Sequence, residues 1–222
     1  MNGSGQKCHT RNQVTAEDCK PYPYLSFRKG VWREIVRYVA NDIGPVESLV
    51  ELGPGFCDFV NQYPARRKIC FELDPAMRKW AGRDVEIRTK SALALAELGE
   101  QTVDCLFASN FLEHFDGEEL GILMPQIHMV LKEGGRLVLL QPNYRLCGEH
   151  YFDDKTHLTI FSDENMAGFL ERFGFRVVKL LPGLLPFSMN SRFPKWPLLV
   201  RIYLALPFKL KAAQMYVVAE KE

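Results

Sequence analysis

The fold is decided by the stretch SLVELGPG at residues 48–55. An almost wholly apolar run is joined there to a turn with two glycines, which predicts a buried strand that ends where a ligand can approach the backbone. A nucleotide-like ligand suits such a turn because main-chain N–H groups are available to it. Glycines also form tight turns for purely conformational reasons, so this motif alone is weak evidence.

Strand and helix patterns alternate along the rest of the chain. Further strands are predicted over residues 68–73, 85–88, 103–109, 135–141, 175–180 and 214–219. Helices are predicted over 27–40, from Pro75 onward, over 118–132, and from a cap at Ser162 to Phe173. The strands are continuously apolar, which is typical of a parallel sheet covered by helices on both faces. The sequence therefore predicts an α/β, Rossmann-like, doubly wound fold.

Length and local composition predict one domain. A chain of 222 residues is long enough for one full core and too short for two large domains. Residues 1–24 are polar and end in a Pro-Tyr-Pro-Tyr run, so we expect a mobile or extended lead-in there. The single domain is expected over 25–222, with an apolar and basic insertion at 181–213.

Charge and cysteine usage exclude several classes of protein. Lys and Arg number 28 against 27 Asp and Glu, a net charge of +1, which disfavours nucleic acid as a partner. The six cysteines form no C-x-x-C pair, and Cys147, His150 and His157 lack the compact spacing of zinc ligands, so no metal site is expected. The sequence shows neither a signal peptide nor about 18–20 consecutive apolar residues, which predicts a cytoplasmic protein.

An acidic residue follows the second predicted strand. Glu72 lies where a carboxylate can accept two hydrogen bonds from the ribose hydroxyls of an adenosine. Asp74 competes for this role, but Pro75 suits a first helical turn, so Asp74 is expected to begin the next helix. The alternative for Glu72 is a solvated acid in a loop.

Four ordered motifs resemble those of class I S-adenosylmethionine-dependent methyltransferases, most closely the small-molecule branch. The motifs are Glu51 to Gly55, Phe71 to Pro75, VDCLFASNFLEH at 103–114, and Leu131 to Leu137. The resemblance covers roughly residues 48–180 and is far more specific than any one motif. It implies a seven-stranded, mostly parallel sheet with one antiparallel strand near the C-terminus. It also implies that S-adenosylmethionine binds across the carboxyl ends of the first, second and fourth strands.

The resemblance implies a set of cofactor-binding residues at those strand ends. The methionine portion would be lined by Glu51, Gly53, Pro54 and Gly55. The ribose hydroxyls would be bound by Glu72, and one face of the adenine would be covered by Leu73. The transferable methyl group would lie beside Asn110 and Phe111.

Two positions depart from the family pattern. Cys57 stands where many members have a third glycine, which is tolerable if the backbone stays right-handed there. Ser91 and Ala92 stand where an acid usually reads the adenine amine. Ser91 is a weaker acceptor, so adenine would be bound less tightly or held by backbone groups.

The loop after the fifth strand is expected to lie over the ligand crevice. Its stretch from Asp153 to His157 resembles an Asp-x-x-His segment of related methyltransferases. We predict His157 to be a general base or an acceptor-orienting group, with Tyr144, Tyr151 and Asp153 as substrate-binding residues. The alternative is that His157 ties the loop to the core. His114 is expected to be structural.

The insertion at 181–213 combines aromatic and aliphatic residues with Lys and Arg. A helix and loop packed on the sheet would account for it. A sharper hypothesis is an apolar lid or a membrane-surface patch for a hydrophobic or lipid-linked acceptor, because basic residues beside Trp and Phe suit anionic lipid. Removal of Phe193 and Trp196 would test this hypothesis.

The sequence thus predicts methyl transfer from S-adenosylmethionine to a small molecule, with oxygen favoured over nitrogen and carbon. A first rival is an NAD(P)-dependent oxidoreductase, since glycines followed by an acid also describe a dinucleotide site, although the third glycine of G-x-G-x-x-G is missing. A second rival is a non-catalytic protein that keeps the fold, which Cys57 and Ser91 leave open. The oligomeric state is left open.

Overall fold

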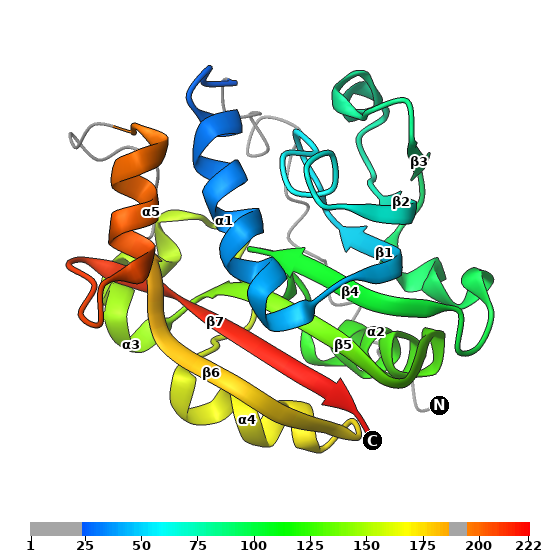
Figure 1. Ribbon diagram of the computed structural model, residues 1–222. Helices are drawn as coiled ribbons and strands as arrows, with labels where there is room; N and C mark the ends of the chain where they lie inside the picture. The colour runs from blue at the N-terminus through cyan, green and yellow to red at the C-terminus, as the bar shows by residue number, and fades with distance from the viewer. Residues whose placement is uncertain (1–23, 187–194) are drawn as a thin grey trace, which may run out of the picture.

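A seven-stranded sheet forms the centre of the described part of the chain (Figure 1). The structure, a computed structural model, describes residues 24–186 and 195–222, so the predicted lead-in lies outside the described residues except for Tyr24. The strands are β1 (Val46–Leu52), β2 (Ala65–Phe71), β3 (Val85–Arg88), β4 (Val103–Ser109), β5 (Leu131–Pro142), β6 (Phe175–Pro186) and β7 (Ala212–Lys221).

The sheet has the order β3-β2-β1-β4-β5-β7-β6. Neighbours from β3 to β5 pair in parallel. β7 runs antiparallel to both β5 and β6. The predicted mostly parallel sheet with one antiparallel strand near the C-terminus is therefore confirmed.

Helices cover both faces of the sheet, as predicted (Figure 1). The α-helices are α1 (Arg28–Ile43), α2 (Gly117–Val130), α3 (Tyr144–Cys147), α4 (Asp163–Glu171) and α5 (Pro197–Ala205). The 3-10 helices are η1 (Pro75–Trp80), η2 (Ala92–Leu98), η3 (Leu112–His114) and η4 (Gly148–Asp153). Because successive strand residues point to opposite faces, Leu106 of β4 packs in the core with α2 and α4, and Phe107 packs in the core with α1. Helices α1 and α5 lie side by side over this second core.

Local sequence explains where α2 and α4 begin. The Asp116 carboxylate accepts a hydrogen bond from the Glu119 amide at 2.9 Å, and the Glu119 carboxylate accepts one from the Asp116 amide at 3.2 Å. Ser162 and Asn165 form the same reciprocal arrangement at the start of α4. The predicted cap at Ser162 is therefore confirmed.

The connection between β1 and β2 differs from the prediction. Residues 55–62 form consecutive turns. Cys57 has a φ of +55°, so its backbone is left-handed and the condition stated for tolerating it is not met. A left-handed residue interrupts a helical hydrogen-bond ladder. The turns are instead anchored by Phe59 and Tyr63, which are buried in the core beside α1.

The segment 181–213 begins inside β6 and ends inside β7, with α5 between them. Pro182 and Gly183 lie within β6, which is tolerated because β6 is an edge strand whose pairing with β7 is already irregular there. Phe193 lies outside the described residues. Over residues 24–186 and 195–222, no helix combines the length and the apolar character that crossing a membrane requires.

Candidate active site

The glycine turn after β1 requires a residue without a side chain. Gly53 has a φ of +60°, and a Cβ atom built there would lie 2.6 Å from Cδ2 of Phe111. The Gly53 amide donates to the carbonyl of Phe71 at the end of β2. The turn, the end of β2 and the residue after β4 therefore meet at one edge of the sheet.

Glu72 lies across this turn. One carboxylate oxygen accepts from the Gly55 amide at 3.2 Å and the other accepts from the Asp74 amide at 3.0 Å. The Asp74 side chain instead caps η1 by accepting from Ala76 at 2.8 Å. Of the two acids, Glu72 is therefore the one placed against the glycine turn. Leu73 is 71% exposed beside it.

Glu51 has a structural place in this region. Its carboxylate is buried and accepts from the Val60 amide at 2.9 Å, which holds the turns after the glycines against β1. Burial raises the pKa of Glu51 well above its ordinary value. Asp58 is also buried and its pKa is raised by burial, against the lowering effect of Arg28, whose Nε lies 2.7 Å from it.

The end of β4 brings two more predicted residues to the same edge. Asn110 has a φ of +48°, and its amide donates to the Leu140 carbonyl at 2.8 Å. Its side-chain oxygen accepts from Gln214 of β7 at 2.9 Å. These bonds fix the turn that places the Phe111 ring against Gly53.

Ser91 and Ala92 begin η2. The Ser91 hydroxyl caps the helix by accepting from the Leu93 amide at 3.2 Å, and Ala92 is buried. Among the described residues, neither Ser91 nor Ala92 forms a hydrogen bond with the glycine turn. Their predicted contact with adenine stays a prediction.

The residues present fit S-adenosylmethionine. Gly53 leaves the backbone uncovered at the carboxyl end of β1, and the two oxygens of Glu72 retain acceptor capacity beside their single amide bonds. The exposed Leu73 offers an apolar surface to an adenine ring. The contacts assigned above to Glu51, Pro54, Gly55, Asn110 and Phe111 stay predictions.

His157 lies within the predicted acceptor loop and is only 9% exposed. Its Nδ1 is 2.5 Å from the carbonyl oxygen of Tyr151, and its ring lies between those of Tyr151 and His114, with centroids 4.8 and 5.0 Å away. This arrangement shows His157 tying the loop to the core. A role as a base stays a prediction.

The other residues predicted for the acceptor site lie at different depths. Tyr151 is fully buried, and its hydroxyl donates to the Thr159 carbonyl at 2.6 Å. Tyr144 is 38% exposed at the start of α3. Asp153 is exposed and lies 2.9 Å from Nδ1 of His150. Tyr144 and Asp153 are therefore the two that are open to a substrate.

Glu113 was missed in the sequence. It is fully buried in η3, and its Oε2 accepts from Gln141 at 2.5 Å. Burial raises the pKa of Glu113 to about 8, against the lowering effect of the Gln141 hydrogen bond. Its position in the sequence gives no signal of this burial, because the residue that lies over it, His157, is distant along the chain.

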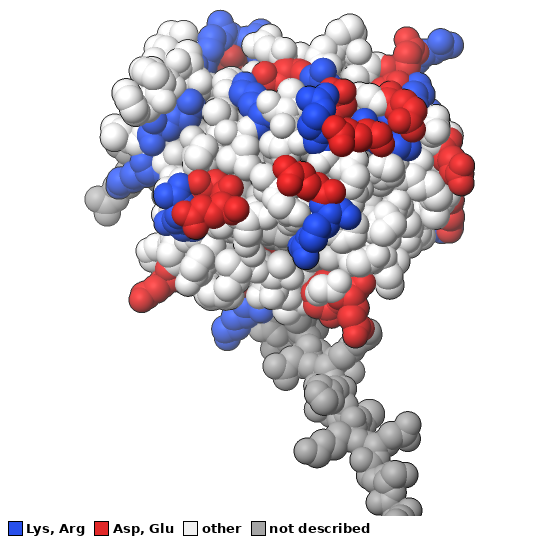
Figure 2. Space-filling view, turned by 90° about the horizontal axis from the view of Figure 1, so that it is seen from below, with Lys and Arg blue, Asp and Glu red and all other residues white. Residues whose placement is uncertain are grey.

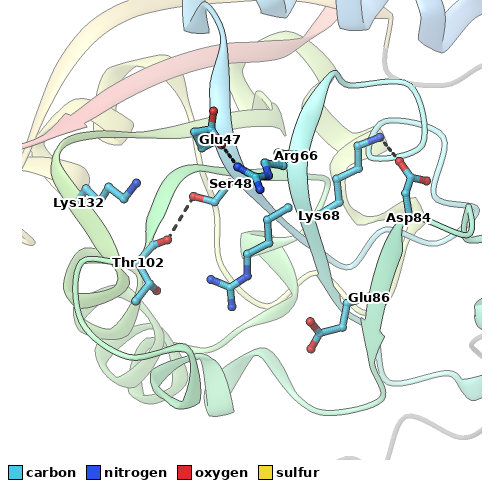
Figure 3. A pocket seen from close by; sticks show the side chains of 9 residues that line it. Glu47, Ser48, Arg66, Lys68, Asp84, Glu86, Thr102 and Lys132 are labelled. Carbon is cyan, nitrogen blue, oxygen red and sulfur yellow. Dashed lines mark hydrogen bonds and ion pairs between the residues drawn. The ribbon is translucent and has the colours of Figure 1, made fainter.

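A groove of about 510 Å³ lies at the opposite edge of the sheet, where the parallel strands begin (Figure 3). Two ion pairs join residues of its lining, with Lys68 2.9 Å from Asp84 and Arg66 4.0 Å from Glu47. It is not the cofactor site, because it lies away from the glycine turn. On the face drawn in Figure 2, acidic and basic side chains of the described residues also lie next to one another, which does not suit nucleic acid.

The chain matches a known protein family and shares its fold with solved structures. Residues 24–180 match the model of a family described as a methyltransferase domain. A comparison with curated proteins finds no match. An S-adenosylmethionine-dependent methyltransferase from Archaeoglobus fulgidus is similar in structure, at 21% identity over 87% of this chain and 94% of that chain, with a TM-score of 0.62.

Two further structures are similar. One is a possible histamine N-methyltransferase from Thermotoga maritima, at 18% identity over 88% of this chain and 91% of that one, with a TM-score of 0.64. The other is geranyl diphosphate C-methyltransferase from Streptomyces coelicolor, at 14% identity over 85% and 77%, with a TM-score of 0.60. At such identities these likenesses show the fold.

The family match spans more than half of the chain and agrees with the site geometry. The match excludes the oxidoreductase and, together with the fold, confirms the predicted enzyme class and cofactor. The chain belongs to the methyltransferase-domain family and is a class I S-adenosylmethionine-dependent methyltransferase.

Proposed function

We propose that this chain methylates a small, apolar acceptor molecule, with a hydroxyl oxygen as the favoured acceptor atom. The observation that supports methyl transfer is the meeting of Gly53, Glu72 and Phe111 at one edge of the sheet, and the preference for oxygen rests on the predicted role of His157 as a base. S-adenosylmethionine supplies an activated methyl group on a sulfonium sulfur. The residues of the chain hold the two reactants in line and exclude water, and this positioning accounts for most of the rate.

Calorimetric titration with S-adenosylmethionine and with its product S-adenosylhomocysteine tests the cofactor site, with NAD as the control. We expect binding of the first two and none of NAD. Binding of NAD in preference to both would contradict the proposed site.

Glu72→Ala is expected to weaken binding of S-adenosylhomocysteine by about 1–3 kcal/mol, because charge-assisted hydrogen bonds to the ribose are lost. Asp74→Ala is the matched control, since Asp74 caps η1 and does not face the glycine turn. Calorimetry of both variants measures the difference. Equal affinities of Glu72→Ala and the wild type would show that another group binds the ribose.

The acceptor atom is tested with a deuterated methyl donor. The chain is incubated with a panel of apolar alcohols, amines and carbon nucleophiles, and the products are analysed by mass spectrometry. Carbon acceptors belong in the panel because one structure of similar fold is named for C-methylation of geranyl diphosphate. We expect labelled ethers, and transfer confined to nitrogen or carbon would refute a hydroxyl acceptor.

We further propose that residues 195–211 bind an anionic membrane surface, from which an apolar acceptor would reach the site. The observation is a cluster of exposed apolar side chains, with Trp196 at 69%, Phe208 at 87% and Leu210 at 82%. The segment 181–213 contains five Lys and Arg residues and no Asp or Glu. Apolar side chains among cations suit anionic lipid. The predicted cytoplasmic location stays a prediction.

Flotation with vesicles that contain an anionic lipid tests this surface. The double variant Trp196→Ala, Phe208→Ala is expected to lose most of the binding, because each side chain contributes buried apolar area. Ile122→Ala is the matched control, since Ile122 is 52% exposed on α2, on the other face of the sheet. Failure of the wild type to float with the vesicles would refute the lipid contact. Formation of a dimer through residues 195–211, without lipid binding, would refute it as well.

A further inference from the structure

Three potential metal ligands converge in the segment after β4. Glu113, His114 and His157 each place one ligand atom within 4.8 Å of the others. Glu113 and His114 belong to η3, whereas His157 comes from the loop after η4. The group lies just after Asn110 and Phe111, the residues expected beside the methyl group.

Hydrogen bonds orient the ring of His157. Its Nδ1 faces the Tyr151 carbonyl at 2.5 Å, and a carbonyl oxygen only accepts, so Nδ1 carries the proton. The other nitrogen, Nε2, therefore presents a lone pair. A metal-binding histidine characteristically donates its second N–H to such an acceptor.

The same logic applies to His114. Its Nδ1 lies 2.8 Å from the Thr156 hydroxyl, and that hydroxyl is 2.5 Å from a carboxylate oxygen of Asp154. The hydroxyl donates its proton to the carboxylate and accepts from His114 Nδ1. The chain from Asp154 through Thr156 thus orients the His114 ring, which also has a backbone hydrogen bond to Asn110.

Glu113 completes the cluster with an unsatisfied acceptor. Glu113 as a whole is 0% exposed, and its Oε1 accepts no hydrogen bond from any described residue. Oε1 lies 3.8 Å from Nε2 of His157, which is too far for a hydrogen bond. Two acceptor atoms that face each other in a buried site call for either a proton on Glu113 or a metal cation between them.

We propose that Glu113, His114 and His157 bind a divalent transition-metal ion, with Zn²⁺ as the representative. Two imidazoles and one carboxylate form a ligand set typical of zinc, at metal–ligand distances of about 2.0–2.2 Å. Three protein ligands leave one coordination position for water or an acceptor atom. The bound ion would fasten η3 to the loop that carries Tyr151. The sequence-based expectation of no metal site considered Cys147 and His150 beside His157, a different set.

Metal binding is measured directly, without turnover, so its outcome is separate from that of the proposed function. The full chain is stripped with a chelator and titrated with Zn²⁺ in competition with a chromophoric zinc indicator, and Mg²⁺ serves as the comparison ion. We expect one equivalent of Zn²⁺ to bind and Mg²⁺ to leave the signal unchanged. Absence of Zn²⁺ binding by the wild type would overturn the proposal without any variant.

Variants locate the site. Glu113→Gln and His157→Asn are expected to abolish the competition with the indicator, and His150→Asn, an exposed histidine outside the cluster, is expected to bind as the wild type does. Circular dichroism confirms that each variant is folded. Equal loss of binding in His150→Asn, or retained binding in both cluster variants, would place the ion elsewhere and overturn the assignment.

A fourth variant leaves all three ligands in place. Thr156→Val removes the hydroxyl that orients His114 and is expected to weaken Zn²⁺ binding by about 10–100-fold, the usual effect of losing an outer hydrogen-bond partner. If Thr156 does not orient His114, the zinc affinity of Thr156→Val would equal that of the wild type. That result would refute the role given to Thr156 and His114.

Discussion

Gly53→Ala is expected to lower the free energy of unfolding by about 2–5 kcal/mol and to abolish cofactor binding. The left-handed backbone at Gly53 would cost an alanine about 1–2 kcal/mol. The new Cβ atom would lie 2.6 Å from Phe111, and overpacking of this kind costs about 1–3 kcal/mol more. Displacement of the Phe111 ring would also fill the space beside the glycine turn. Urea unfolding and calorimetric titration with S-adenosylhomocysteine measure the two effects.

Gly55→Ala separates backbone strain from the clash. Gly55 has a φ of +51°, but a Cβ atom there meets nothing within 4 Å. Its loss of stability is therefore expected to stop at about 1–2 kcal/mol. Equal losses in the two variants would mean that the Phe111 ring moves away at no cost, and that the contact with Gly53 does not constrain the site.

The pH dependence of stability is expected to reveal the buried carboxyl of Glu113. Burial raises its pKa from 4.5 to about 8, so the folded protein holds this proton more tightly than the unfolded chain. The resulting stability is fully present below about pH 4.5 and is lost as the pH rises toward 8. The loss amounts to about 3–5 kcal/mol, since each pKa unit is worth about 1.4 kcal/mol. Urea unfolding with a chelator present, from pH 4.5 to 8.5, measures it.

Glu113→Gln is the comparison, because the amide has nearly the same shape and does not titrate. Other groups contribute to the pH profile of both proteins, so the informative quantity is the difference between the two curves. We expect the difference to grow steadily above pH 4.5 in favour of the variant. Parallel curves over the whole range would show that Glu113 is ionised in the folded protein at a pKa near its ordinary value.

Most of the sheet could be predicted because each strand is a short apolar run between turn residues. The strands over 85–88 and 103–109 were predicted with the bounds that the structure gives. β6 was predicted to end at Leu180, because Pro182 and Gly183 are unfavourable in a strand interior. The position of β6 at the sheet edge removes that penalty, and a strand's place in the sheet is set by partners distant in sequence.

The site was predicted less completely because it depends on contacts between distant segments. Glu72 could be placed by its position after a strand, and the structure sets it against Gly55. Cys57 adopts a left-handed backbone that local propensity disfavours, since the buried turns around it decide its conformation. Glu113 looks like any loop acid in the sequence. Its burial follows only from the packing of the loop that carries His157 over η3.

The position of β7 has a consequence for the order of folding. β6 precedes β7 along the chain, yet β7 lies between β5 and β6, so within the described sheet β6 is attached only through its later neighbour. Closing the loop between β6 and β7 costs conformational entropy, and this cost is offset only when β7 pairs with β5 and β6. Until β7 docks, the edge of β5 stays unpaired and open to strands of other molecules. Docking of β7 therefore covers the edge of β5 and leaves β6 as the edge strand on that side of the sheet.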